Sequence, residues 1–336
     1  MKKEGRDRQR VLFVGGRYLA DVLQKYGEFD VDLTKSFEYN LPGSLKMFAS
    51  LLSVRRIWNY DILHVNSANG LIASYTLPAK VRAFHAHGRQ IGIYFEGAKH
   101  LKGYELKLFK KAGFLVQEAI RRADLFFVAT PDIYECAKKI RDDAIWTPNP
   151  IDFEVFRDKG AKAQLSGKPA VFCPTRVQSV KKPEMGFRIY NEIRSFFPEA
   201  NFHVVTWGNL VKYYRRRFGG RRDIIWHSKI PRIELPKYYR GADLVLGQFG
   251  YNYCSLIELE AAACGVPVVT LDEFEGVGQR KRSLEDFVAV SLRFLQDEAF
   301  KTREVEKNLH IVRTTHSPSE SVEILSENYS RAILKK

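Results

Sequence analysis

Residues 242–270 read ADLVLGQFGYNYCSLIELEAAACGVPVVT, and this stretch decides the fold class. A short apolar run at 244–246 opens it and another at 266–269 closes it, each of strand length. The helix-forming residues 256–264 lie between them, and Gly265 is suited to end that helix. A strand, loop, helix and strand in succession are typical of a parallel α/β sheet.

The loop before this helix has the properties of an anion site. Residues 250–255 lead into a first helical turn whose backbone N–H groups lack intrahelical partners and suit a phosphate. Glu258 and Glu260 follow, about 200° apart around the helix axis. Glu260 falls in an apolar arc, where an unpaired carboxylate is costly. We expect its partner to be either a pair of ligand hydroxyls or a neighbouring Arg or backbone N–H.

The same stretch resembles a known signature. ADLVLGQ followed by SLIELEAAACGVPVV is similar to the nucleotide-binding segment of glycosyltransferases with the GT-B fold, especially the retaining family 4 type. The resemblance implies that Glu260 binds the ribose hydroxyls of a nucleotide-sugar donor. It also assigns Tyr253, Cys254 and Ser255 to the donor site. The family has a second Glu eight residues earlier, near the donor sugar, and this chain has Asn252 there.

Basic residues follow the strand expected at 169–174. In the resembled family this loop carries an Arg and, five residues later, a Lys that hold the donor diphosphate, and Arg176 and Lys181 have that spacing. A guanidinium fork and an ammonium would neutralise the departing diphosphate without a metal ion. A solvated basic loop is the alternative. The resemblance also assigns Gly208 and Ile230 to donor binding, with Ile230 beside the nucleotide base.

The beginning of the chain gives a weaker signal. Residues 11–14 predict a strand, and Gly15 and Gly16 follow at once. A glycine pair there lets the backbone approach a ligand closely, although a plain tight turn is the alternative. The dinucleotide fingerprint G-x-G-x-x-G is absent. In the resembled family a glycine-rich loop at this place faces the cleft between the domains.

Residues 66–87 are expected to form a helix and residues 91–95 a strand. In the resembled family the loop after this strand commonly contains His-Gly, with the His near the reacting centre. Here the loop reads Glu96-Gly97-Ala98-Lys99. Glu96 is expected either to act in the cleft, at the carboxyl end of a strand, or to pair with Lys99.

The composition of the chain limits the classes of protein to which it can belong. A chain of 336 residues suits two domains, and 45% hydrophobic and 28% charged residues describe an ordinary globular protein. We find no apolar run long enough to span a membrane and no signal peptide in the charged start MKKEGRDRQR. The four cysteines are scattered, which fits a reducing cytoplasm and indicates neither a disulfide framework nor a zinc site.

The formal net charge of +15 implies an anionic partner: a nucleotide, a phospholipid surface or nucleic acid. The helix expected at 100–122 mixes apolar and basic residues, so it either packs on the core with a solvated basic face or lies on an anionic membrane. The run YYRRRFGGRR at 213–222 suits a solvated surface, anionic lipid or single-stranded nucleic acid. Of these partners, nucleic acid is the least expected.

The resemblance implies two Rossmann-like α/β domains facing a cleft, as in the GT-B fold. We expect an N-terminal acceptor domain at 1–155, a polar linker at 156–168 and a nucleotide-sugar domain at 169–315. A C-terminal helix at 316–336 is expected to cross back onto the first domain.

The resembled family transfers a sugar, with retention, from a nucleotide-sugar such as a UDP or GDP conjugate to a saccharide or lipid-linked acceptor. Arg176, Lys181, Asn252 and Glu96 are the expected catalytic residues, and no metal or further cofactor is expected. We expect a cytoplasmic protein with an optional contact to the inner face of the membrane. Two alternatives stay open: a basic protein that binds or modifies nucleic acid, and an inactive relative that only binds nucleotide.

Overall fold

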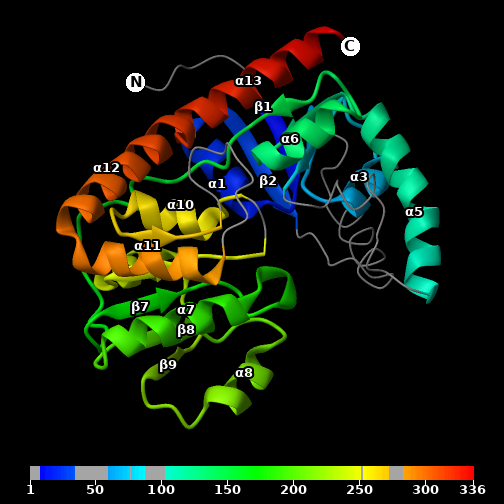
Figure 1. The fold of residues 1–336 in the computed structure, drawn as a ribbon. Helices are drawn as coiled ribbons and strands as arrows, with labels where there is room; N and C mark the ends of the chain where they lie inside the picture. The colour runs from blue at the N-terminus through cyan, green and yellow to red at the C-terminus, as the bar shows by residue number, and fades with distance from the viewer. Residues whose placement is uncertain (1–7, 35–59, 76, 88–102, 251–252, 272–282) are drawn as a thin grey trace. The chain divides into compact units, whose positions relative to one another are not determined.

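The computed structural model describes residues 8–34, 60–75, 77–87, 103–250, 253–271 and 283–336. The contacts within the chain divide it into two compact units (Figure 1). Unit 1 comprises Met1–Pro150 and Pro318–Lys336, and unit 2 comprises Ile151–Ser317. Each unit is built on a parallel sheet with helices packed on it, so the predicted fold class is confirmed.

The sheet of unit 1 is six-stranded and parallel, with the order β2-β1-β3-β4-β5-β6. Its strands are β1 (Gln9–Val14), β2 (Phe29–Thr34), β3 (Ile62–Val65), β4 (Val81–Ala86), β5 (Leu125–Val128) and β6 (Ile145–Trp146). Its helices are α1 (Arg17–Tyr26), α3 (Ala68–Ser74), α5 (Gly103–Arg122), α6 (Pro131–Lys138) and α13 (Pro318–Leu334). Because β2 and β3 lie on opposite sides of β1, the strand order reverses between β1 and β3.

Strand β4 corrects the expectation of a single helix over residues 66–87. The helix α3 ends at Ser74, and Pro78 follows, which disfavours helical backbone at the preceding residue. The strand lies between β3 and β5 and is buried at five of its six residues. A central strand buried on both faces lacks the alternating pattern of a half-exposed strand, and periodicity cannot separate it from a buried helix. The strand expected at 91–95 lies outside the described residues.

The sheet of unit 2 is five-stranded and parallel, with the order β11-β10-β7-β8-β9. Its strands are β7 (Ala170–Cys173), β8 (Asn201–Val205), β9 (Ile224–His227), β10 (Leu244–Leu246) and β11 (Val268–Val269). Its helices are α7 (Pro183–Phe196), α8 (Val211–Phe218), α9 (Leu235–Gly241), α10 (Leu256–Ala263), α11 (Leu284–Gln296) and α12 (Glu298–Thr315). The strand, loop, helix and strand predicted from 242–270 are β10, α10 and β11.

The segment expected as a linker, residues 156–168, belongs to unit 2 by its contacts. The Phe156 side chain is buried there, with its ring 6.4 Å from that of Tyr239. Arg240 in α9 donates from Nε to the carbonyl of Ala161 at 3.0 Å and from Nη1 to that of Arg157 at 2.9 Å. The beginning of this segment is therefore fastened to unit 2.

The C-terminal helix α13 packs on unit 1, which confirms the predicted return of the chain (Figure 1). Its fully buried Tyr329 packs edge-on against Phe29 and Phe127, with ring centroids 5.7 and 6.0 Å away. The Tyr329 hydroxyl lies 2.5 Å from Nδ1 of His64 in β3. Burial raises the pKa of Tyr329 well above its ordinary value, so this hydroxyl stays protonated. The helix thus completes the core of unit 1.

Replacing Tyr329 by Ala is expected to destabilise unit 1 by about 3–5 kcal/mol, the usual cost of emptying an aromatic position in a core. Tyr329→Phe keeps the ring and removes only the hydroxyl beside His64, so it should cost about 1–3 kcal/mol. Urea unfolding followed by circular dichroism measures both. Equal losses from the two variants would contradict a packing role for the ring.

Candidate functional site

In unit 2 the strand order reverses between β7 and β10, because β8 and β10 lie on opposite sides of β7. Open parallel α/β sheets bind ligands in the crevice outside the carboxyl ends of the strands at this reversal. Two loops border it: residues 174–182 after β7 and residues 247–255 after β10. The first carries Arg176 and Lys181, and the second leads to Cys254 and Ser255. The fold thus brings these predicted residues to one edge of the sheet.

The loop after β7 is fastened to the loop after β8. Val177 donates its N–H to the carbonyl of Trp207 at 2.9 Å and accepts from the N–H of Leu210 at 3.0 Å. The indole N–H of Trp207 donates to the carbonyl of Pro174 at 3.3 Å. The predicted Gly208 sits at φ 122°, and a Cβ there would lie 2.4 Å from the carbonyl oxygen of Val177. The close contact and the positive φ both require glycine at this position.

Arg176 is held by an aromatic ring that sequence reasoning did not single out. Its guanidinium carbon lies 4.4 Å from the ring centroid of Trp207, and the ammonium of Lys229 lies 5.4 Å from the same ring. Cations over an indole face are attracted by its electron density. The Trp207 ring therefore gathers two cations at the carboxyl edge of the sheet.

Lys181 ends a short 3-10 turn, Ser179–Lys181, and lies near the fully buried carboxylate of Glu258. Burial lowers the pKa of Lys181, while the negative charge of Glu258 raises it and Arg176 lowers it again. Burial raises the pKa of Glu258, and Lys181 is the largest influence that opposes this rise. The two groups therefore stabilise each other's charged form.

Glu258 caps α10 and joins it to the preceding loop. One carboxylate oxygen accepts from the N–H of Ser255 at 2.8 Å and from its hydroxyl at 2.5 Å. The other accepts from the N–H of Gln248 at 2.5 Å. A Cβ at Gly247 would lie 2.5 Å from this second oxygen, so glycine is needed for the approach. The start of α10, predicted as an anion site, thus already holds a carboxylate of the chain itself.

Glu260, predicted to meet a ribose, is also buried, at 2% exposure. Its Oε1 accepts from Nε and Nη2 of Arg232 at 2.8 and 2.7 Å, and its Oε2 accepts from the hydroxyl of Tyr239 at 3.3 Å. Burial raises the pKa of Glu260, and Arg232 and Tyr239 oppose that rise. The structure therefore shows the neighbouring Arg that the sequence allowed as an alternative, and the ribose contact stays a prediction.

The other residues predicted for the donor site have the following places. Ile230 follows β9 and is partly buried, packed against a core cluster of unit 2. Tyr253 is buried, and its carbonyl accepts from the side-chain amide of Gln248 at 2.9 Å. Cys254 is half-buried. Asn252 lies outside the described residues.

In unit 1 the predicted Gly15 and Gly16 lie at the reversal between β1 and β3, both with positive φ, 79° and 69°. Asn66, at the end of β3, donates from its amide to the carbonyl of Gly15 at 3.0 Å. A Cβ at Gly16 would lie 2.6 Å from that amide. Both glycines are thus required by backbone conformation, and Gly16 also by the close approach of a side chain.

His87 follows β4 directly and joins this edge. Its Nε2 lies 2.6 Å from Oδ1 of Asn66, and its Nδ1 lies 3.2 Å from the hydroxyl of Tyr18, which also contacts the side chain of Asn149. The sequence continues with Gly88, which gives a His-Gly pair like the one expected after the strand at 91–95. Treating residues 66–87 as a helix hid this pair, and Glu96, proposed in its place, lies outside the described residues.

A chain of histidines leads from His87 into the core of unit 1. The rings of His85 and His87 stack 4.2 Å apart, and Nε2 of His64 lies 3.2 Å from Nδ1 of His85. Burial lowers the pKa of His87 to about 4, while Asn149 opposes the shift. Burial also lowers the pKa of His64 and of His85 well below the ordinary value. All three rings are neutral at pH 7.

Neither a metal site nor a membrane-spanning helix is found in the part of the chain that the structure describes. No three or more His, Cys, Asp or Glu side chains there are grouped to hold a metal ion, and no helix there is long and apolar enough to cross a bilayer. An Asp-x-Asp sequence, Asp30-Val31-Asp32, lies within β2. Asp32 accepts from the hydroxyl of Tyr60 at 2.5 Å and lies 3.7 Å from Nη2 of Arg10.

The contact between the two loops of unit 2 predicts the effect of a single methyl group. A Cβ at Gly250 would lie 1.8 Å from the carbonyl oxygen of Val180, so Gly250→Ala must push the loops apart. We expect a loss of about 1–3 kcal/mol in the free energy of unfolding, as for other overpacked sites. Gly220→Ala is the matched control, because a Cβ there has no neighbour within 4 Å among the described residues. Urea titration of both variants measures the difference, and equal stabilities would contradict the contact.

The buried histidines predict a pH dependence. A His whose pKa is lower in the folded state than unfolded contributes stability above pH 6.5 that is lost as the pH falls toward 4, because the unfolded chain binds more protons there. Each pKa difference of one corresponds to about 1.4 kcal/mol. His87→Gln should therefore flatten the fall in unfolding free energy between pH 6.5 and 4. Exposed His310→Gln should leave the fall unchanged. An unchanged slope in His87→Gln would show that its ring is not buried in the neutral form.

The chain is similar to known proteins in part of its sequence and, over nearly its whole length, in its fold. No protein-family model matches the chain. A segment of 144 residues is 29% identical to the GDP-mannose-dependent alpha-(1-6)-phosphatidylinositol monomannoside mannosyltransferase of Mycolicibacterium smegmatis. That match covers 36% of this chain and 36% of the relative's length.

Solved structures are similar over nearly the whole chain. Sucrose-phosphate synthase of Thermosynechococcus elongatus has a TM-score of 0.73 at 13% identity, over 98% of this chain and 100% of that one. HepE of Anabaena, solved in complex with UDP and glucose, has a TM-score of 0.67 at 13% identity, over 96% and 100%. At such identities the likeness shows the fold alone. The chain has the GT-B fold, and its residues 242–270 resemble the nucleotide-binding segment of retaining family 4 glycosyltransferases.

Proposed function

We propose that this protein is a glycosyltransferase that moves a sugar from a nucleotide-sugar to a hydroxyl acceptor, with retention of the anomeric configuration. The observation that carries the proposal is the pair of cations, Arg176 and Lys181, beside the start of α10 at the strand reversal of unit 2. A leaving nucleoside diphosphate gains negative charge as the glycosyl bond breaks. Fixed cations in a partly buried site stabilise that charge more than water does.

The donor would be a UDP- or GDP-linked sugar bound by unit 2. Arg176 offers a planar fork for two phosphate oxygens and is held in place by Trp207. Lys181 supplies a second positive charge, which Glu258 keeps in the charged form. Glu260, with Arg232, would meet the ribose, and Ile230 and Gly208 would border the base and the diphosphate. No metal ion is needed if these cations carry the leaving group.

In the reaction the bond between the sugar carbon and the phosphate oxygen breaks, and its electron pair leaves with the nucleoside diphosphate. The acceptor oxygen forms the new bond to the same carbon, and its proton passes to an oxygen of the departing diphosphate. We place the acceptor in unit 1, beside Gly15, Gly16 and His87. The neutral imidazole of His87 can hydrogen-bond a hydroxyl without adding charge. We further propose that Asn252 faces the donor sugar and that Glu96 acts on the acceptor side.

The acceptor would be a saccharide or a lipid-linked molecule. The mycobacterial relative is named for a phosphatidylinositol mannoside acceptor, which favours a lipid. In α5, Phe114 and Leu115 are 65% and 55% exposed, and the exposed Arg121 follows about two turns later on the same helix. Adjacent exposed apolar side chains near a cation suit the surface of an anionic membrane. We therefore propose a cytoplasmic enzyme that contacts the membrane face peripherally.

Thermal unfolding in the presence of nucleotides tests the donor site. UDP, GDP and their sugar conjugates are added in turn without metal, and a ligand that binds the folded state raises the melting temperature. We expect one base to be selected, with the shift lost in Arg176→Ala and in Glu260→Ala. Arg188→Ala, an exposed Arg on α7, is the control that should keep the shift. If no nucleotide shifts the wild-type protein, the transferase proposal fails.

A further inference from the structure

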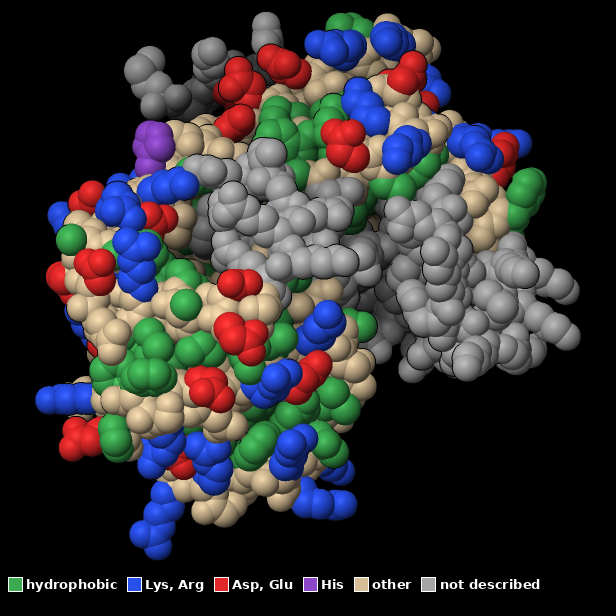
Figure 2. All heavy atoms as spheres, in the orientation of Figure 1, with side chains coloured by type: hydrophobic (Ala, Val, Ile, Leu, Met, Phe, Trp, Pro, Cys, Tyr) green, Lys and Arg blue, Asp and Glu red, His purple; other side chains and the backbone are tan. Residues whose placement is uncertain are grey.

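Helix α8 packs on helix α7 of unit 2 through aromatic side chains on one of its sides. Tyr214 and Phe218 both stack on Phe187, with ring centroids 4.9 and 4.6 Å away. Away from this contact the helix and the turn after it carry exposed cations, which we call the basic side of α8: Lys212, Arg215, Arg216, Arg217 and Arg222. Figure 2 shows Lys and Arg side chains gathered at the end of unit 2 where Figure 1 labels α8.

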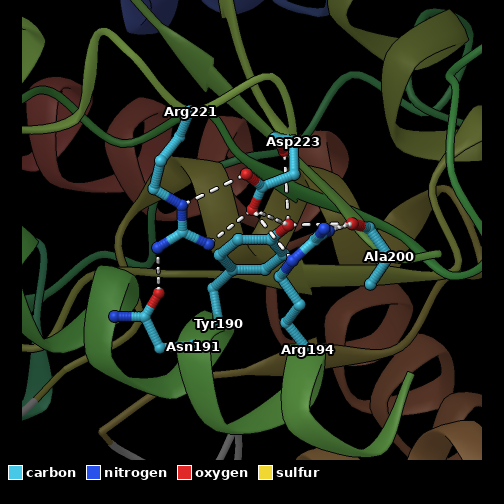
Figure 3. A network of polar contacts seen from close by, with 6 residues as sticks. All are labelled: Tyr190, Asn191, Arg194, Ala200, Arg221 and Asp223. Carbon is cyan, nitrogen blue, oxygen red and sulfur yellow. Dashed lines mark hydrogen bonds and ion pairs between the residues drawn. The ribbon is translucent and has the colours of Figure 1, made fainter. Parts of the chain in front are cut away.

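These cations have no acidic partner in the part of the chain that the structure describes, where none of the five forms an ion pair. Their neighbour Arg221 differs, because it binds both carboxylate oxygens of Asp223 at 3.1 and 2.5 Å (Figure 3). Lys212 and Arg216 are four residues apart, a spacing at which like charges on a helix repel. Arg217 donates to the hydroxyl of Tyr213 at 3.4 Å and lies over the ring of Phe218. The positive charges on the basic side of α8 therefore repel one another, and a bound anion would reduce this repulsion.

The proposed donor does not account for these charges. Helix α8 starts after the loop at the carboxyl end of β8 and leads to the amino end of β9. These cations therefore follow a path that leads away from the carboxyl edge, where Arg176 lies: the guanidinium of Arg215 is 5.8 Å from the ring centroid of Trp226 within β9, and Arg222 stands two residues before the amino end of that strand. A diphosphate bound at the carboxyl edge leaves them available to another partner.

We propose that the basic side of α8 docks unit 2 on the headgroups of an anionic phospholipid bilayer. Each Lys or Arg close to such a surface strengthens binding about fivefold. Guanidinium groups, four of the five cations, match phosphate oxygens with a planar fork. Tyr213, 55% exposed on the same helix, has the amphipathic ring that suits a boundary between water and acyl chains.

Single-stranded nucleic acid fits this surface less well. Proteins that bind it combine a basic groove that follows the backbone with several aromatic rings on which bases stack. Here the cations stand on an exposed helix, and Tyr213 is its one largely exposed aromatic side chain. The inference concerns a surface of unit 2 and does not rest on sugar transfer.

Vesicle co-sedimentation tests the proposal on the full chain. The vesicles are phosphatidylcholine alone or phosphatidylcholine with one third phosphatidylglycerol, at about 0.1 M salt, where the Debye length is about 10 Å. We expect binding only to the anionic vesicles, weakened at least tenfold in Arg215→Gln/Arg216→Gln/Arg217→Gln. The same three positions changed to Lys keep the charge and should stay within about threefold of the wild type.

The matched control removes three exposed lysines elsewhere in unit 2: Lys159→Gln/Lys162→Gln/Lys168→Gln. It lowers the net charge equally, so it should bind like the wild type if the location of the charge matters. Circular dichroism checks that every variant is folded. Anionic-vesicle binding that is equal in both triple Gln variants would overturn the proposal. So would a single-stranded oligonucleotide that binds more tightly than the vesicles and is lost in the α8 variant, since that assigns the surface to nucleic acid.

Discussion

The buried carboxylate of Glu258 determines the arrangement of the carboxyl edge of the unit 2 sheet, where we propose that the donor binds. It accepts hydrogen bonds from the loop after β10 and from the cap of α10, and it lies beside Lys181 of the loop after β7. A charge taken out of water is costly unless such partners compensate it. The need for them explains the glycine at 247, where any side chain would meet the carboxylate. The chain's own contacts thus hold both loops in place, as electrostatic stabilisation of a leaving group would require.

The two cations of this edge are held in different ways. The guanidinium of Arg176 lies over the ring of Trp207. Burial lowers the pKa of Lys181, and the negative charge of Glu258 opposes that shift. An anion that draws Lys181 toward itself competes with Glu258 for the same ammonium. An anion bound by Lys181 would therefore be coupled, through Glu258, to the cap of α10.

The sequence predicted the strand, loop and helix around α10 because turn residues and caps bound each segment there. It placed Glu258 and Glu260 on different sides of the helix but not their partners, since Gln248 and Arg232 reach them only through the tertiary fold. Strand β4 was missed because a strand buried on both faces has no alternation to detect. That error also hid His87, whose place directly after the strand is the local signal for the role that we propose for it.

The two units differ in charge where their strand order reverses. In unit 2 the edge holds Arg176, Lys181 and Lys229, which suit an anionic ligand. In unit 1 it holds Asn66 and His87, both uncharged at neutral pH because burial lowers the pKa of His87 to about 4. Fold alone does not select an activity, since one fold hosts many. Sugar transfer needs a cationic edge that binds a diphosphate and a neutral, hydrogen-bonding edge that binds a hydroxyl. The two units supply this combination, which supports the proposed function beyond the likeness of fold.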